Sequence, residues 1–297
     1  MITNTYPSIT QYQQLVELKD YRTKTKYEYV RQVRQLAQHF KCDPASLSEN
    51  QLREYFVFLR VEKEWQGSAM TQARVALRSF FRENLKAGTD WTVFEDLRIA
   101  RPETLPLVLT REEVALVLGT LHERRFKVCL RLIYHCGLRV GEAVSLDPHD
   151  VHGRENPPRL HIKNAKGRKD RYVPIAAGMV EELRQWWRTH RNPLWLFPAQ
   201  QLGRPAGQTA NSMRTGSVQG AFAAARLECG LRPGAHVHTL RHCYATHMLE
   251  AGVNIRQLRD YLGHTSIETT MIYTHLTALS EARTQATIQT LYQTLKG

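Results

Sequence analysis

The chain has 297 residues, of which 42% are hydrophobic and 23% charged, a composition typical of folded globular proteins and sufficient for two domains. No apolar run approaches the roughly 18 residues that span a membrane, and the opening MITNTYPSITQYQQ lacks the features of a signal peptide. Five scattered cysteines without a CxxC pair indicate free thiols. We therefore expect a cytoplasmic protein and exclude the membrane and disulfide-rich secreted classes.

The charge balance favours a polyanionic partner. Lysine and arginine number 41 against 28 acidic residues, which gives a net charge of +13. Up to residue 104 the chain holds 16 basic and 13 acidic residues, whereas the remainder holds 25 and 15. The excess therefore lies mainly in the second part, although a merely basic soluble protein is the simpler alternative.

The first hundred residues predict a small all-helical domain. Apolar residues recur at helical spacing, and Ser48 with Gln51 has the pattern of a capping box. The helices are expected at residues 8–20, 25–40, 52–59 and 73–88. Because the aromatic residues follow the same period, we expect them in the core rather than as stacking platforms for bases.

The segment RIARPETLPLVL, residues 98–109, has two prolines and no helical period, which predicts an extended interdomain linker. Thr110 and Glu113 then open a second domain as a capping box. Residues 126–146 read as a helix that breaks at Gly137, followed by a new helix start at Arg139. An arginine gains nothing from the dipole at a helix start, so an anion ligand is favoured over a solvated surface arginine.

Residues 160–175, LHIKNAKGRKDRYVPI, predict a β-hairpin with a polar turn. Its basic residues are Lys163, Lys166, Arg168, Lys169 and Arg171. Such a run is usually a solvated turn or a set of phosphate contacts, but one lysine at a hairpin tip can reach a neighbouring active site. Helical segments follow near residues 178–190 and 211–230.

The stretch from His238 to His275 predicts three short helices. The first ends at Gly252, the second begins at Asn254 and closes at Gly263, and the third opens with a capping box of Thr265 and Glu268 and carries Tyr273.

Two placements in this stretch suggest chemistry. His238 and Arg241 are one turn apart and project to the same side, and His264 follows a helix-ending glycine nine residues before Tyr273. A phenol among histidines and arginines indicates nucleophilic attack on an anion, and phosphate is the best candidate because guanidinium groups bind its oxygens in pairs.

Taken together, these motifs resemble the tyrosine recombinase, or phage integrase, family. The sequence segments that match are, in chain order, GLRVGEAVSL, AKGRKDRYVP, HTLRH, LGH and YTH. The residues that carry the resemblance are Arg139, Lys166, His238, Arg241, His264 and Tyr273. It covers nearly the whole chain, because the helical front part is similar to the core-binding domain of that family.

The resemblance implies a role for each of these residues. Tyr273 would attack a DNA phosphodiester and leave a 3′-phosphotyrosine, while Arg139 and Arg241 would clamp the phosphate. Lys166 would be the general acid for the leaving 5′ oxygen. His238 would accept the tyrosine proton or hold the phosphate, and His264 would donate to a phosphate oxygen. Glu142 would support these residues without reacting.

The resemblance also implies the architecture and the partners. The fold would be mainly α with a small β-sheet in the catalytic domain (α+β), forming a two-domain clamp on double-stranded DNA. Residues 1–97 would be the core-binding domain, 98–109 the linker and 110–297 the catalytic domain with a C-terminal tail helix. No cofactor and no metal would be needed. Four protomers would exchange strands through a Holliday junction. The tail would either dock on a neighbouring protomer, as in that family, or fold back on its own protomer. DNA contacts are expected from Lys24, Lys26, Lys163, Arg168, Lys169 and Arg171.

Three other interpretations remain open. His238, His242 and His247 could suggest zinc, but no carboxylate or cysteine stands at ligand spacing. The chain could be a DNA-binding relative that has lost catalysis, or a type IB topoisomerase that uses the same nucleophile chemistry to relax DNA. The target site and the direction of recombination do not follow from the sequence.

Overall fold

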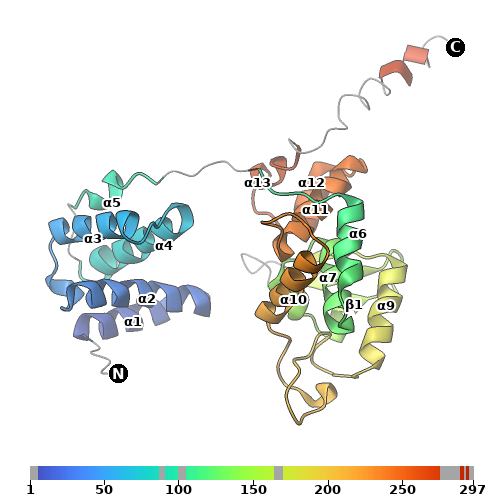
Figure 1. Cartoon of the computed structure of the whole chain (residues 1–297), viewed down its shortest axis with the longest axis horizontal. Helices are drawn as coiled ribbons and strands as arrows, with labels where there is room; N and C mark the ends of the chain where they lie inside the picture. The colour runs from blue at the N-terminus through green and yellow to red at the C-terminus, as the bar shows by residue number, and fades with distance from the viewer. Residues whose placement is uncertain are drawn as a thin grey trace. The chain divides into compact units, whose positions relative to one another are not determined.

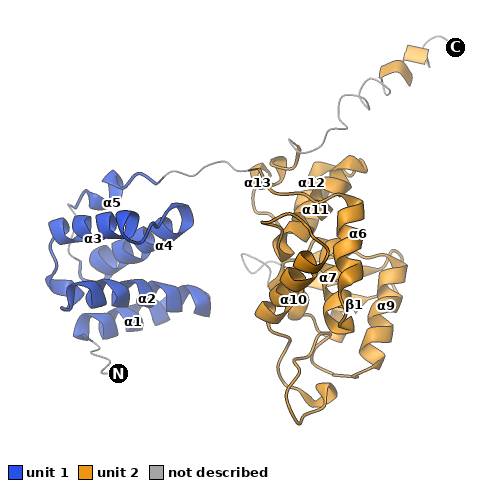
Figure 2. Cartoon of the chain, in the orientation of Figure 1, with its two compact units in different colours: residues 1–104 blue, residues 105–297 orange. Residues whose placement is uncertain are grey.

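The computed structural model describes residues 6–86, 91–99, 105–163, 170–274, 288–290 and 292–293. The chain forms two compact units, residues 1–104 and 105–297 (Figure 2). In the described part both units are built mainly from helices, and the second also holds a small antiparallel sheet (Figure 1). The predicted fold class is therefore confirmed. No helix among the described residues is both long and apolar enough to cross a membrane.

The first unit is a helical bundle whose starts follow local capping signals. Ser48 and Gln51 form the predicted capping box, with each side chain bound to the other residue's backbone N–H. The elements are α1 (Pro7–Leu18), α2 (Thr23–Phe40), η1 (Pro44–Ser46), α3 (Glu49–Val61), α4 (Gly67–Arg78), the π-helical turn η2 (Ser79–Asn84) and α5 (Val93–Asp96).

Aromatic side chains fill the core of this unit, as their helical spacing predicts. Tyr12, Tyr55, Phe80 and Phe81 are buried, and the Tyr12 ring meets the Phe80 ring edge-on with centroids 5.3 Å apart. The Tyr12 hydroxyl donates to the backbone oxygen of Ala76 at 3.1 Å, so its polar atom is satisfied inside the core. These rings hold the bundle together and do not form an exposed stacking surface.

The boundary between the two compact units, at residues 104 and 105, falls inside the stretch 98–109 that was expected to link the domains. Leu109 is buried there, and its N–H donates to the Cys243 sulfur at 3.1 Å. Thr110 and Glu113 then form the predicted capping box. The helices are α6 (Arg111–Thr120), α7 (Arg124–Cys136), α8 (Val140–Val144), η3 (Pro148–Asp150), α9 (Ala177–Arg188), η4 (Ala206–Gln208), α10 (Thr215–Glu228), α11 (Val237–Glu250), α12 (Ile255–Leu262) and α13 (Glu268–Met271).

The sheet has three short antiparallel strands in the order β1 (Val151–His152), β2 (Arg159–Ile162) and β3 (Arg171–Pro174). The predicted hairpin is β2 and β3, paired with Leu160 opposite Val173. Both of these side chains are fully buried, which fixes the register. β1 was not predicted, because two residues carry no detectable alternation.

Both ends of α12 agree with the sequence prediction, whereas the start of α13 does not. The Asn254 side chain accepts from the Arg256 N–H as a cap, and Gly263 ends the helix with φ +63°. The expected capping box of Thr265 and Glu268 is wrong, because α13 begins two residues later, at Glu268 itself, and the Ser266 hydroxyl accepts from the Glu268 N–H. Tyr273 follows α13 instead of lying on it.

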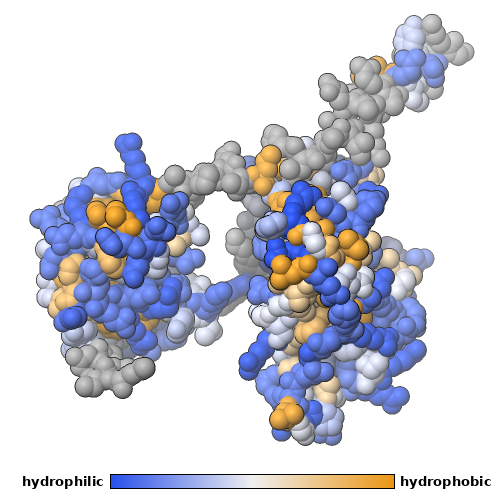
Figure 3. All heavy atoms as spheres, viewed as in Figure 1, coloured by the Kyte–Doolittle hydropathy of each residue, from blue (hydrophilic) through white to orange (hydrophobic). Residues whose placement is uncertain are grey.

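The visible surface of both units is mostly hydrophilic, with small separate hydrophobic patches (Figure 3). The apolar residues instead form a core within each unit, which is the distribution expected of a folded protein in water.

We predict that Gly137→Ala destabilises the second unit by about 2–4 kcal/mol. Gly137 ends α7 with φ +59°, where an L-residue is strained, and an added Cβ would overlap the buried ring of Tyr244. Calorimetric unfolding of the full chain measures the effect.

Gly220→Ala is the matched control, because Gly220 lies inside α10 and nothing surrounds its Cβ position within 4 Å. This change should stabilise the helix by about 0.5–1 kcal/mol. Equal effects of the two substitutions would contradict the role given to the Gly137 conformation.

Candidate active site

Five segments of the second unit bring their polar side chains together. They are the start of α8, strand β3, helix α11 and the short segments that follow α12 and α13. The side chains are Arg139, Glu142, Arg171, His238, Arg241, His242, His264 and Tyr273. All the predicted catalytic residues that the structure describes belong to this group.

The carboxylate of Glu142 is the centre of the group. It accepts from Arg139 Nη1 at 2.8 Å and from the Arg139 N–H at 2.8 Å, and Arg171 binds both of its oxygens at 3.0 and 2.8 Å. Arg241 Nη1 lies 3.9 Å away. Burial opposes ionisation, but the hydrogen bonds and charge of Arg171, with those of Arg139, hold the pKa of Glu142 at about 2. The carboxylate is therefore charged at neutral pH.

Arg241 is almost completely enclosed, with 1% of its surface exposed. Its Nη1 donates to the backbone oxygen of Gly137 at 2.7 Å and its Nη2 to that of Leu262 at 2.5 Å. Burial and the like charge of Arg139 lower the pKa of Arg241 to about 9, so it stays protonated at pH 7. Three guanidinium groups thus meet one carboxylate, which leaves a positive site that favours an anion.

Arg171 differs from its expected place among the DNA contacts. Its side chain is 8% exposed and, besides binding Glu142, its Nε donates to the backbone oxygen of Tyr261 at 2.7 Å. Its guanidinium also packs over Gly263, where a Cβ would lie 3.0–3.2 Å from it. Arg171 therefore ties the hairpin to α12 and to the carboxylate at the centre of the group.

The other basic residues that are expected to contact DNA differ in their ion pairs and in their exposure. Lys163 pairs with Asp147 at 2.8 Å and Asp150 at 2.6 Å, and Lys26 pairs with Glu17 at 2.9 Å, whereas Lys24 is exposed. The predicted general acid Lys166, with Arg168 and Lys169, lies outside the described residues.

Two of the predicted histidines are neutral at physiological pH. Partial burial, followed by the charges of Arg241 and Arg139, lowers the pKa of His264 to about 3, and its Nδ1 lies 2.9 Å from the Thr270 hydroxyl. His238 keeps an exposed position on the first turn of α11. Desolvation and the Arg241 charge still lower the pKa of His238 to about 4. Both rings therefore offer a donor and an acceptor without adding charge.

Tyr273 is buried, with 2% of its surface exposed, beside the positive group. Its ring stacks on that of His264 with centroids 6.5 Å apart, and its hydroxyl lies 2.9 Å from His242 Nδ1. Burial raises the pKa of Tyr273, and Arg241 and Arg139 act in the opposite direction. The phenol is therefore un-ionised at neutral pH and close to the cations.

His242 is the site residue that the sequence reasoning did not single out. Its position four residues after His238 puts both rings on one face of α11, where they meet edge-on with centroids 4.6 Å apart. That spacing was a usable signal. His247, also considered for zinc, instead lies 2.9 Å from the Tyr134 hydroxyl. Among the described residues, no group of three His, Cys, Asp or Glu side chains could hold a metal ion.

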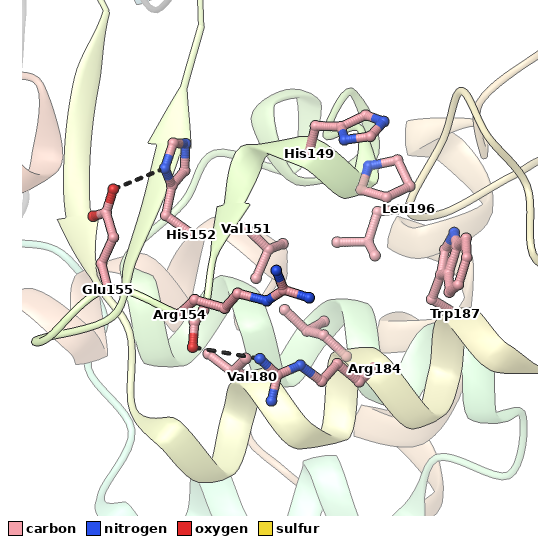
Figure 4. Close-up of a pocket in the computed structure, with 12 residues that line it drawn as sticks. His149, Val151, His152, Arg154, Glu155, Val180, Arg184, Trp187 and Leu196 are labelled. Carbon is pink, nitrogen blue, oxygen red and sulfur yellow. Dashed lines mark hydrogen bonds and ion pairs between the residues drawn. The ribbon is translucent and has the colours of Figure 1, made fainter.

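A pocket of about 440 Å³ lies elsewhere in the second unit, between the β1 region and α9 (Figure 4). Val151, Val180 and Leu196 give it an apolar lining. Two of its polar side chains have hydrogen-bond partners nearby, since Arg184 donates to the backbone oxygen of Gly153 and His152 lies 3.1 Å from Glu155. The group around Tyr273 contributes no side chain to this pocket.

We predict that Arg171→Met lowers the free energy of unfolding of the second unit by about 3 kcal/mol. This is the low end of the cost of removing one partner of a buried ion pair, because Glu142 keeps Arg139. Calorimetry of the full chain measures the loss.

Arg188→Met is the control, because Arg188 is 65% exposed and its pairing with Glu181 spans 3.7 Å. We expect a change of about 0.5 kcal/mol or less for this variant. An Arg171→Met variant as stable as Arg188→Met would show that the hairpin does not depend on the buried pair.

The sequence matches known proteins over both units. Residues 108–279 match the Phage integrase family, and residues 9–91 match the Phage integrase, N-terminal SAM-like domain. A putative integrase/recombinase of Sinorhizobium fredii is 34% identical over 87% of this chain and 80% of its own length. A tyrosine recombinase of Pseudothermotoga lettingae is 31% identical over 77% of this chain and 78% of its own.

The fold also matches solved structures. XerH site-specific recombinase, in a post-cleavage complex with its palindromic difH substrate, superposes with a TM-score of 0.71. The match covers 94% of this chain and 85% of that one. Because the identity is 22%, it supports the fold alone. Two matching domains in order, and relatives above 30% identity along most of the chain, place this protein in the phage integrase family of tyrosine-type site-specific recombinases.

Proposed function

We propose that this recombinase cleaves and rejoins double-stranded DNA through a 3′-phosphotyrosine formed on Tyr273. The observation that carries the proposal is the buried phenol next to a group of three guanidiniums that a single carboxylate neutralises only in part. A phosphodiester brings one negative charge and its transition state a second, which this site would balance.

The contacts of each arginine leave donors for a phosphate. Arg241 uses two of its five N–H groups on backbone oxygens, and the Arg139 side chain uses one on Glu142. Their remaining donors would hold the non-bridging oxygens, and loss of one such donor typically costs about 10²–10³ in rate. His238 and His264, both neutral, would donate to the same phosphate or hold it in place.

The leaving 5′ oxygen needs a proton. The ammonium group of Lys166 is the proposed source, delivered from the hairpin whose second strand, β3, is fixed to Glu142 through Arg171. Because a phosphotyrosine keeps the energy of the broken phosphodiester bond, rejoining requires no nucleotide, and we propose that no metal ion takes part.

We predict that Tyr273→Phe binds DNA normally and forms no covalent adduct, because the phenylalanine ring keeps the packing but lacks the oxygen nucleophile. The measurement is trapping on a nicked duplex from the DNA flanking the gene, in the presence of EDTA, with the 3′ end tested for attached protein.

Tyr134→Phe is the matched control, since Tyr134 is also a tyrosine bonded to a histidine of α11, although it is only partly buried. It should form the adduct at the wild-type rate. An adduct that persists in Tyr273→Phe would move the nucleophile to another residue. Wild-type protein that binds the duplex without forming any adduct would instead be a DNA-binding relative without catalysis.

Strand exchange would require several protomers. We propose that two domains of each protomer enclose the duplex and that four protomers act on two sites through a Holliday junction. The basic excess of the chain supports binding to DNA, and Leu276, Leu279, Ile288, Leu291 and Leu295 give the tail apolar side chains for docking on a neighbour.

We predict that gel filtration gives four protomers on a four-way junction, and that a chain truncated after Thr274 binds the same junction with fewer protomers. The loss would follow from removing the apolar residues of the tail. Complexes of one protomer per DNA with the full chain, on duplex and on junction, would contradict the tetramer and favour a topoisomerase-like monomer.

A further inference from the structure

The hydroxyl of Tyr273 has a defined partner in a residue with no role in the reaction so far. His242 Nδ1 lies 2.9 Å from it, and the two ring centroids are 5.7 Å apart. His242 follows Arg241 on α11, and the edge of the His238 ring supports it from one turn away. The contact therefore rests on a packed helix, which holds the imidazole in one orientation.

Burial, assisted by the charges around it, keeps the His242 ring neutral. Burial lowers the pKa of His242 to about 4, and the neighbouring His238, His236 and Arg241 act in the same direction. A neutral imidazole carries one nitrogen with a free lone pair. At physiological pH this ring can accept a proton, which a protonated imidazole cannot.

The phenol needs such an acceptor. Tyr273 is buried, and its burial raises its pKa above that of an ordinary tyrosine, which is ionised in about one molecule in a thousand at pH 7. An attack that waited for the free phenolate would use only this small fraction. A base within hydrogen-bond reach removes that limit by taking the proton as the oxygen attacks.

We propose that His242 is the general base that takes the proton of Tyr273 during DNA cleavage, with the phenol donating to Nδ1. This inference rests on the proposed function, in which Tyr273 is the nucleophile. The phenol oxygen bonds to phosphorus while the bond from phosphorus to the 5′ oxygen breaks. The phenolic proton passes to Nδ1, and the leaving oxygen takes a proton from the general acid. Rejoining reverses each transfer.

This assignment divides the histidines between two tasks. His238, exposed at the start of α11, is left for the phosphate, whereas the half-buried His242 serves the nucleophile. A bound phosphate would also offset the positive charge of Arg241 that acts on His242. The imidazole would therefore become a better proton acceptor when the substrate is in place.

The test is the rate of adduct formation on the trapping duplex as a function of pH. His242→Asn places an amide oxygen near the Nδ1 position but cannot take a proton. We expect a rate lower by about 10²–10⁴ at pH 7. The variant rate should rise about tenfold per pH unit as the phenolate fraction grows, whereas the wild-type rate stays flat from about pH 6 to 9. Free imidazole should restore part of the rate of His242→Ala.

His247→Asn is the matched control, because His247 lies on the same helix and its Nδ1 is also 2.9 Å from a tyrosine hydroxyl, that of Tyr134. It should keep the wild-type rate and pH dependence. A His242→Asn variant with the wild-type rate, or a faster one, and a flat pH profile would overturn the proposal. Because Tyr273→Phe would still form no adduct in that case, failure of the base and failure of the nucleophile are separate results.

Discussion

The ion pairs of Glu142 are the interaction on which the site depends. Arg139, Arg171 and Arg241 come from three different elements, and their like charges would repel one another in a partly dry environment. One ionised carboxylate allows them to stay together, but it cannot neutralise all three. The group is thus stable enough to fold and remains positive enough to attract a phosphate. A second carboxylate would have improved the ion pairing and weakened the site for anions.

The same positive charge also acts on the neighbouring histidines and on the phenol. Besides burial, Arg241 is among the causes that lower the pKa of His238, His242 and His264, and it opposes the effect of burial on Tyr273. Burial has the larger effect on the histidines and on the phenol, but the charge of Arg241 links all of them to the site that would bind the anion. They are coupled, because a bound anion that reduces the positive charge changes all of these groups together.

Features that depend on a few consecutive residues were predicted well from the sequence, whereas contacts between distant segments were not. The capping boxes at Ser48 and Thr110 and the helix ends at Gly137 and Gly263 depend on a few consecutive residues, so the chain itself specifies them. The motifs of the resemblance likewise led to Arg139, Arg241 and Tyr273. The Arg171 bond to Tyr261 joins residues 90 positions apart, and the bond between His242 and Tyr273 joins residues 31 apart. Only the packing of α11, α12 and β3 creates these pairs.

Arg241 shows why stability and chemistry are difficult to separate in this protein. The oxygens that it binds belong to Gly137 and Leu262, at the ends of α7 and α12, where helices have unpaired carbonyls and a partial negative charge. The two helix ends thus help to hold a cation that burial alone would disfavour. The guanidinium in turn joins the two helix ends. Gly137 and Gly263, in the left-handed conformation, direct the backbone at these ends towards it. A substitution of Arg241 would remove the proposed phosphate ligand and a structural link at once, so the loss of activity alone would not identify its cause.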